Sequence, residues 1–129
     1  MNVKIDTKEK FTVIKPEVSI IPAIMTEDLG EMLLGYLKQT VPHIVLNLSC
    51  VESIDSVALE KIASVQQEFY EQNCSFIVCG LLENVEKAFD DNDLLEIMNV
   101  TPTESEAWDI VQMEEIEREL MSDFDEEAS

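Results

Sequence analysis

The chain has 129 residues, of which 46% are hydrophobic, and its 28 acidic and 8 basic side chains give a net charge of −20. A chain of this length fits one domain that can bury a core without disulfides or metal ions. The negative charge argues against binding to nucleic acid or to anionic membranes, because both require basic side chains facing phosphates, and it fits either a solvating coat or a partner with a basic surface.

The first fifteen residues predict a β-hairpin. Val3 and Ile5 alternate with polar residues, as do Phe11 and Val13, and the polar residues 7–10 link the two strands. Four lysines make this the only net-basic stretch of the chain.

A helix is predicted to follow the hairpin. It begins near Thr26, where a hydroxyl side chain followed by two acids supplies a start signal, and it ends before Pro42. Its apolar residues are Leu29, Met32, Leu33, Tyr36 and Leu37. Their spacing of i, i+3, i+4, i+7 and i+8 forms a single apolar face.

Two short apolar runs in the middle of the chain predict buried central strands. Residues 43–48 and 75–79 are nearly continuous in hydrophobic side chains and are too short for helices. Between them, residues 49–55 are expected to form a loop and residues 56–72 a helix. The buried face of that helix is expected to consist of Leu59, Ile62, Ala63 and Phe69.

The rest of the domain is predicted to contain a short helix, an edge strand and a closing helix. The short helix spans residues 85–89 and stops at the acidic cluster of residues 90–93, and residues 97–100 form the strand. Overlapping capping boxes at residues 101–104 and 103–106 mark the start of the closing helix.

Strands that alternate with helices predict right-handed crossovers and an α/β fold. We expect a mixed, largely parallel sheet of four to five strands with interleaved helices, formed by residues 1–115. Residues 114–129 hold eight acidic side chains and one Arg. Such a segment buries too little apolar surface to offset the entropy of ordering, so residues 116–129 are expected to form a frayed acidic tail.

The sequence shows no sign of export, membrane insertion or disulfide formation. Its start lacks the pattern of a signal peptide, and no apolar run approaches the ~20 residues of a membrane helix. Cys50, Cys74 and Cys79 have neither CxxC nor zinc-site spacing. We therefore expect a cytoplasmic protein whose thiols are reduced and structural.

Catalytic and cofactor-binding motifs are also missing from the sequence. His43, the only histidine, stands at the start of a predicted strand, where a structural role is expected. The three glycines form no phosphate-binding loop, and the acidic residues 90–93 lack the spacing of a calcium site. We expect a protein that is not an enzyme and that binds neither metal nor cofactor.

The most informative segment is residues 54–59, which follows a buried strand and opens a helix. Ser56 stands at or near the N-cap of that helix. Its hydroxyl could act as a cap that stabilises the helix by ~1 kcal/mol. It could also accept a phosphate, because a helix N-terminus offers unpaired N–H groups and the positive end of the helix dipole. The two roles are compatible.

This segment and its surroundings resemble a known family. The apolar residues 43–48, a six-residue loop and then Asp55-Ser56 resemble the strand-loop-helix signature of STAS domains, the fold of bacterial anti-sigma factor antagonists. Residues 75–85 resemble the family's next strand and short helix, and residues 103–111 resemble its closing helix.

The resemblance covers roughly residues 3–115 and implies partner switching in signal transduction and transcription regulation. In the family, the unphosphorylated antagonist binds an anti-sigma factor that is a serine kinase, and a phosphatase reverses the phosphorylation. The phosphorylation site maps onto Ser56 and the preceding acid onto Asp55. The implied partner-binding segment is Asp55, Ser56, Val57 and Ala58.

Other functions stay open at this point. Val57 and Ala58 stand where the family usually has a second hydroxyl residue and a Gly, and the loop at residues 15–19 lacks the Gly and Asp that the family usually has before its first helix. The altered loop favours a constitutive STAS binding subunit of a signalling scaffold or a transporter ATPase, without phosphorylation, whereas the retained Ser56 favours the phosphorylated switch. An enzyme or a phospho-Asp receiver domain is a third possibility. A receiver needs an acid at the end of the central strand, where this chain has Asn47 and Leu48.

Overall fold

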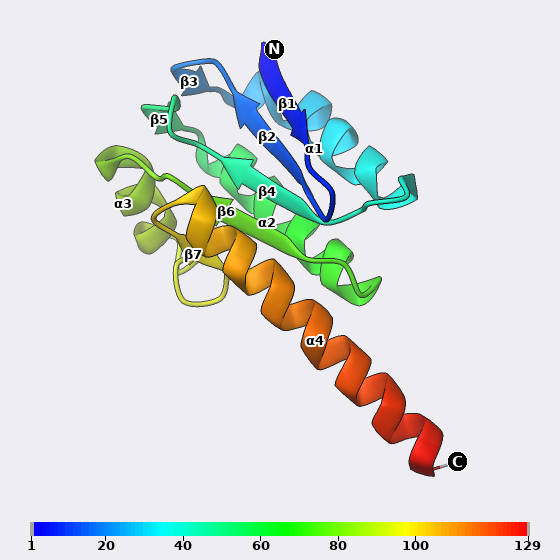
Figure 1. The fold of residues 1–129 in the computed structure, drawn as a ribbon. Helices are drawn as coiled ribbons and strands as arrows, with labels where there is room; N and C mark the ends of the chain where they lie inside the picture. Colours follow the sequence, from blue (N-terminus) through cyan, green and yellow to red (C-terminus); the bar gives the residue numbers. More distant parts are fainter. Residues whose placement is uncertain (1, 129) are drawn as a thin grey trace.

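The fold is built on a sheet of mixed direction (Figure 1). The structure is a computed structural model that describes the backbone of residues 2–128 and the side chains of residues 2–121. Within those residues the main sheet has five strands in the order β1-β2-β4-β6-β7. Their bounds are β1 Val3–Thr7, β2 Thr12–Pro16, β4 Ile44–Asn47, β6 Phe76–Cys79 and β7 Val100–Thr101. β1 pairs with β2 antiparallel and the other neighbours pair parallel, which confirms the predicted mixed, largely parallel α/β sheet.

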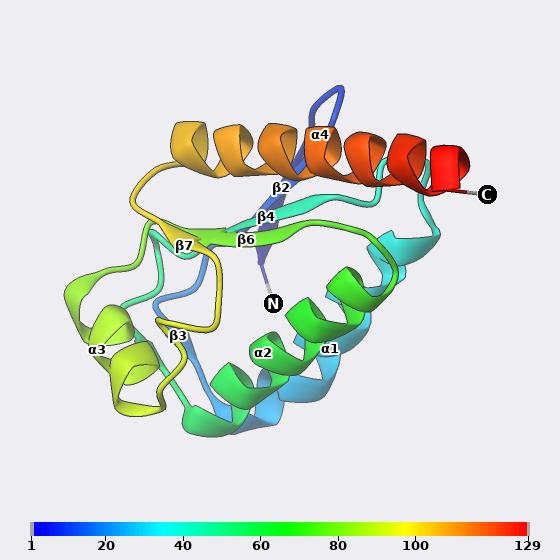
Figure 2. The ribbon, with the colours of Figure 1, turned by 90° about the horizontal axis from the view of Figure 1, so that it is seen from below.

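Helices cover both faces of the sheet (Figure 2). On one side lie α1 (Thr26–Gly35), α2 (Ser56–Glu71) and α3 (Glu83–Asp91). On the other side lies α4 (Glu104–Ala128). Because both faces are covered, the central strands are apolar apart from Asn47 at the end of β4, in agreement with the nearly continuous apolar runs in the sequence.

The side chains of β4 show how the two cores arise. Ile44 and Leu46 belong to the larger core between the sheet and α1, α2 and α3, whereas Val45 between them belongs to the smaller core under α4. Strand side chains alternate between faces, so a run of buried residues supplies both cores. Phe11 extends the smaller core by stacking on Trp108 of α4, with ring centroids 4.9 Å apart.

A small sheet that the sequence did not predict lies beside the main one. β3 (Ile20–Ile21) pairs in parallel with β5 (Ser53–Ile54), inside the stretch that was expected to be a loop. Two-residue strands are too short to produce a hydrophobic alternation, so no sequence pattern marks them. The short 3₁₀ helix η1 (Ala23–Met25) precedes α1 and was missed for the same reason. The helix predicted from Thr26 includes Tyr36 and Leu37, but α1 ends at Gly35 and the chain continues as the 3₁₀ helix η2 (Tyr36–Lys38).

The edge strand near residue 100 is displaced from its predicted position. It was expected at residues 97–100, but β7 is Val100–Thr101 and the side chain of Ile97 is 70% exposed. The N–H of Met98 donates to the carbonyl of Leu94 at 2.9 Å, which closes a helical turn where a strand was expected. That turn buries Leu94 and Met98 instead of Ile97.

The closing helix α4 continues well beyond the sheet (Figure 1). At its start, the hydroxyl of Thr103 accepts a hydrogen bond from the N–H of Glu106 at 3.2 Å, as the second capping box predicted. The backbone is helical to Ala128. The division into a domain of residues 1–115 and an acidic tail of residues 116–129 stays a prediction. No helix in residues 2–128 is long and apolar enough to cross a membrane.

Candidate functional site

The N-terminus of α2, the segment that carries the family resemblance, is positioned by the loop that precedes it and by the small sheet of β3 and β5. In the loop after β4, Leu48 and Val51 are fully buried. The chain then forms β5, and the N–H of Asp55 donates to the carbonyl of Ile21 on β3 at 2.9 Å. The small sheet therefore fixes the position at which α2 begins.

Asp55, not Ser56, is the N-cap of α2. Its backbone is extended (φ −72°, ψ 147°), and its carboxylate Oδ1 accepts a hydrogen bond from the N–H of Val57 at 2.9 Å. Its carbonyl accepts the first helical hydrogen bond, from Leu59, at 3.1 Å. The sequence placed Ser56 at or near this cap. The structure places it one residue further on, as the first residue of the helix.

Ser56 is exposed to solvent. Within the part of the chain whose side chains are described, its hydroxyl takes part in no hydrogen bond. The first-turn N–H groups of a helix have no partner within the helix, and Asp55 satisfies the one at Val57. The hydroxyl is therefore free to react without breaking a contact that stabilises the fold.

The surroundings of Ser56 are partly apolar. The side chain of Val57 is 49% exposed. Ile20 pairs with Ser53 in the small sheet and is also exposed, and Ile24 in η1, which lies against α2, is 86% exposed. These exposed hydrophobic residues, on α2 and on elements that pack against it or lead into it, add apolar surface of the kind that protein partners bind.

Ala58 differs from the other three residues of the predicted partner-binding segment. Its side chain is fully buried in the larger core, whereas Asp55, Ser56 and Val57 are exposed. A buried alanine presents no side-chain surface to a partner. Its contribution is to seat the first turn of α2 against the core.

Asn47 joins the loop before α2 to the start of α4. Its Oδ1 accepts a hydrogen bond from the N–H of Ser49 at 2.9 Å, and its Nδ2 donates to Glu104 Oε1 at 2.7 Å. Gly80, at the end of β6, has φ +73°, and a Cβ built there would lie 3.0 Å from Asn47 Oδ1. Both the backbone conformation and the close approach require glycine at this position.

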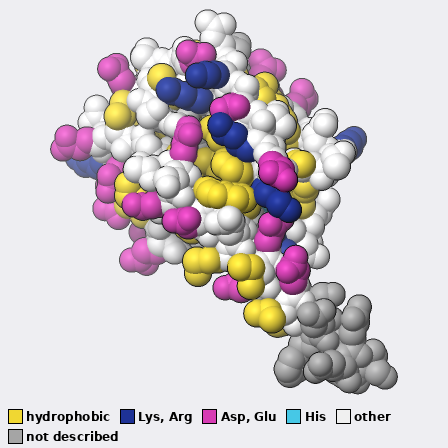
Figure 3. Space-filling model, viewed as in Figure 1, with side chains coloured by type: hydrophobic (Ala, Val, Ile, Leu, Met, Phe, Trp, Pro, Cys, Tyr) yellow, Lys and Arg dark blue, Asp and Glu magenta, His cyan; other side chains and the backbone are white. Residues whose placement is uncertain are grey.

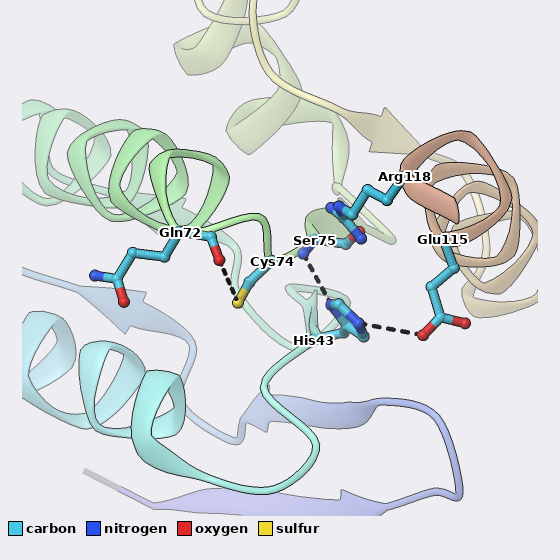
Figure 4. A network of polar contacts seen from close by, with 6 residues as sticks. All are labelled: His43, Gln72, Cys74, Ser75, Glu115 and Arg118. Atoms are coloured by element: carbon cyan, nitrogen blue, oxygen red, sulfur yellow. Dashed lines mark hydrogen bonds and ion pairs between the residues drawn. The ribbon is translucent and has the colours of Figure 1, made fainter. Parts of the chain in front are cut away.

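Polar side chains at the opposite end of the sheet form a paired network (Figure 4). The Nδ1 of His43 accepts a hydrogen bond from the N–H of Ser75 at 3.0 Å, and its Nε2 lies 3.3 Å from Glu115 Oε1. Arg118 donates from Nη2 to the Ser75 hydroxyl at 2.9 Å. These contacts tie β4 and β6 to α4, which supports the structural role expected for His43.

The environment of His43 disfavours its protonation. Burial lowers the pKa of His43, and the nearby Arg118 guanidinium lowers it further, while Glu115 acts in the opposite direction. Because Nδ1 is the acceptor for Ser75, the proton of the neutral ring lies on Nε2, toward Glu115.

Burial makes the thiols of Cys74 and Cys79 less reactive than a free cysteine. Cys79 is fully buried, and burial raises the pKa of its thiol to about 12. Burial also raises the pKa of Cys74, whose Sγ lies 3.4 Å from the carbonyl of Gln72. Among the described residues, no group of His, Cys, Asp or Glu side chains is arranged to hold a metal ion.

Comparisons with known proteins agree with the architecture. The family model of the STAS domain matches residues 2–107. Among solved structures, protein TM1081 from Thermotoga maritima superposes with a TM-score of 0.76 at 22% identity, over 85% of this chain and 94% of that chain. No curated protein sequence matches the chain significantly.

Three further solved structures share the fold. The anti-sigma factor antagonist SpoIIAA in its unphosphorylated form has a TM-score of 0.69 at 18% identity, over 86% of this chain and 96% of that chain. The phosphorylated form of the Bacillus protein SpoIIAA has a TM-score of 0.62 at 18% identity, over 85% of this chain and 99% of that chain. The murine anion transporter Slc26a9 has a TM-score of 0.67 at 12% identity, over 81% of this chain but only 18% of the transporter.

Proposed function

Because the chain belongs to the STAS domain family, we propose that it is an anti-sigma factor antagonist, which binds a kinase-like anti-sigma factor while Ser56 is unphosphorylated. The observation that carries the proposal is the position of Ser56. Its hydroxyl is exposed and makes no hydrogen bond within the described side chains, directly after the capping residue Asp55.

A phosphate on Ser56 would change the binding surface more than the fold. It adds about −1.5 to −2 charges one residue from the carboxylate of Asp55 and beside the exposed side chain of Val57. Docking would then require the removal of water from a dianion next to apolar groups, which weakens association. The cap hydrogen bond from Val57 to Asp55 does not involve Ser56, so it can persist in both states.

The proposal includes an anti-sigma factor serine kinase that phosphorylates Ser56 and a phosphatase that reverses the modification. These partners imply a bacterial, cytoplasmic regulatory protein without catalytic activity of its own. The structural neighbour SpoIIAA, known in unphosphorylated and phosphorylated forms, supports this reading.

A constitutive STAS binding subunit is the second candidate. Val57 is exposed where the family usually has a hydroxyl residue, so a kinase would meet an altered surface there, whereas Ala58, which stands where the family usually has a glycine, is buried. The likeness to part of the Slc26a9 anion transporter is consistent with such a subunit. In this alternative the same surface binds a scaffold or transporter protein and Ser56 is never modified.

Phosphate incorporation separates the two functions. The wild-type protein is incubated with ATP and each anti-sigma factor kinase of the source organism, and intact mass is measured. We expect one phosphate on the wild type and on Ser53→Ala, a control at an exposed serine three residues away, and none on Ser56→Ala. If the wild type binds these kinases but incorporates nothing, the switch is wrong and the constitutive function is favoured. If Ser56→Ala is still phosphorylated, the assigned site is wrong.

A further inference from the structure

The outward side of α4 carries an apolar ridge that the fold does not use. Met113, Ile116 and Leu120 stand at i, i+3 and i+7, and their side chains are 59%, 56% and 63% exposed. Met121 beside them is also exposed. This spacing forms one continuous stripe on a helix.

The ridge is distinct from the side of α4 that packs on the sheet. Val111 is fully buried against the sheet, and Glu115 and Arg118 turn toward His43 and Ser75. Residues i+4 and i+7 from Val111 share its face, so the inward face runs through Val111, Glu115 and Arg118. The ridge lies on the other side of this helix, which continues past the sheet (Figure 1).

The apolar residues are concentrated there rather than scattered. Among the described side chains, four of the ten exposed large hydrophobic residues fall within residues 113–121. The space-filling view shows hydrophobic side chains in a row along the projecting helix, with acidic side chains beside them (Figure 3). A contiguous exposed stripe of this kind marks an interaction surface.

The charges beside the ridge determine which occupant fits. Glu117 and Glu119 are exposed, and residues 114–129 carry eight acids against one Arg. That basic group, Arg118, is directed inward to Ser75. A second copy of this chain would bring the same acids and another net charge of −20 to the contact, which like-charge repulsion opposes.

We propose that the ridge of Met113, Ile116 and Leu120 is a docking surface for a basic amphipathic helix of a partner protein. The apolar stripe of the partner would pack along the ridge, and its flanking Lys or Arg side chains would pair with Glu117 and Glu119. α4 and α2 lie on opposite sides of the sheet (Figure 2), so this partner and one at Ser56 can bind at the same time.

A synthetic helical peptide of leucine and lysine tests the apolar part of the proposal. Its Kd is measured by calorimetry for the wild type, for the double variant Ile116→Gln/Leu120→Gln, and for the control Ile5→Gln/Ile97→Gln, whose two isoleucines lie elsewhere and are 50% and 70% exposed. We expect the ridge variant to weaken binding about tenfold and the control less than about twofold. Circular dichroism verifies that each variant is folded. Equal effects of the two variants would overturn the proposal.

The charge complementarity is tested with matched pairs of acids. Glu117→Gln/Glu119→Gln and the control Glu83→Gln/Glu86→Gln on α3 each remove two exposed carboxylates. We expect the first pair to weaken peptide binding and to reduce its dependence on salt more than the control does. Equal effects would show non-specific attraction to an acidic protein. Equally tight binding of a leucine and glutamate peptide would also overturn the proposal.

Sedimentation distinguishes the partner helix from a second copy of the chain. We expect the wild type to be monomeric at concentrations of tens of micromolar and the ridge variant to sediment identically. A wild-type dimer that Ile116→Gln/Leu120→Gln dissociates would assign the ridge to self-association and overturn the proposed occupant.

Discussion

Polar side chains at the two ends of the parallel strands differ in their hydrogen bonding and in their exposure to solvent. Where β4 and β6 begin, His43, Ser75, Glu115 and Arg118 are paired with one another and partly shielded from water. At the start of α2, beyond the other end of the strands, the Ser56 hydroxyl is exposed and makes no hydrogen bond within the described side chains. Polar groups that the protein satisfies internally stabilise the fold, whereas an unsatisfied exposed group is available to solvent, enzymes and partners.

The largest effect that we expect at the exposed end, near Ser56, is a change in the affinity for the partner. Phosphorylation of Ser56 should weaken binding to the anti-sigma factor by about 2–3 kcal/mol, or roughly a hundredfold in Kd, because a dianion must lose water at the interface. Ser56→Asp should weaken binding less, since it adds one charge, and Ser56→Ala should bind like the wild type. Calorimetric titration measures the Kd of the unphosphorylated wild type, the phosphorylated wild type and the two variants. Wild-type affinity in Ser56→Asp would show that this end of α2 is outside the interface.

Stability should respond to the capping residue and not to its neighbour. Asp55→Ala should lower the free energy of unfolding by about 1 kcal/mol, because it removes the acceptor for the N–H of Val57. Ser56→Ala should change it by less than about 0.5 kcal/mol, since its hydroxyl makes no contact to lose. Urea denaturation compares the two variants. A larger loss in Ser56→Ala would mean that Ser56 carries a structural contact, and the contrast between the two ends would fail.

The paired end should make stability depend on pH through His43. Its pKa is lowered in the folded protein by burial and by Arg118, with Glu115 and Glu114 opposing. The unfolded chain, with a histidine pKa of about 6.5, therefore takes up a proton at higher pH than the folded one. The contribution of His43 to stability is therefore fully present above the pKa of the unfolded chain. It is lost as the pH falls from there toward the lower pKa that His43 has in the folded protein.

His43→Asn isolates this contribution, because the amide oxygen can still accept the hydrogen bond from Ser75. Unfolding free energies of the wild type and the variant are measured between pH 8 and pH 5. We expect the wild type to lose more stability than His43→Asn on acidification. Parallel pH profiles would show that His43 does not titrate differently in the two states.

Truncation of α4 should have the smallest effect where the network is retained. A chain that ends at Met121 keeps Glu115 and Arg118, so its thermal midpoint should be almost unchanged. A chain that ends at Glu114 loses both, which leaves the Ser75 hydroxyl without its partner and exposes His43, and its midpoint should fall. A large loss on truncation after Met121 would mean that residues 122–129 also stabilise the fold.

Much of the fold could be predicted because its elements have strong local patterns. The apolar runs at residues 43–48 and 75–79 and the 3.6-residue period of α2 are long enough to identify the central strands and the helix between them. β3 and β5 have two residues each, and their pairing depends on a contact between segments more than thirty residues apart. β7 begins later than predicted because a helical turn at residues 94–98 buries Leu94 and Met98. The local sequence pattern alone does not distinguish that turn from a strand.

The site was predictable in position but not in detail. Asp55 and Ser56 are both good capping residues, so the sequence could not distinguish which one is the cap. The backbone hydrogen bond from Asp55 to Ile21 decides the matter, because it holds Asp55 in an extended conformation just before α2. The network around His43 was beyond prediction, since Arg118 contacts Ser75 across 43 residues of sequence.

The assignment of the helix cap to Asp55 has a practical consequence for protein engineering. Position 56 tolerates chemical change without loss of the structure that presents it, so it is a suitable attachment point for an environment-sensitive dye. A cysteine introduced there would be exposed, whereas Cys74 and Cys79 are buried and the thiol of Cys79 has its pKa raised to about 12. After replacement of the half-buried Cys50, selective labelling of position 56 would turn the protein into an optical sensor of its own partner.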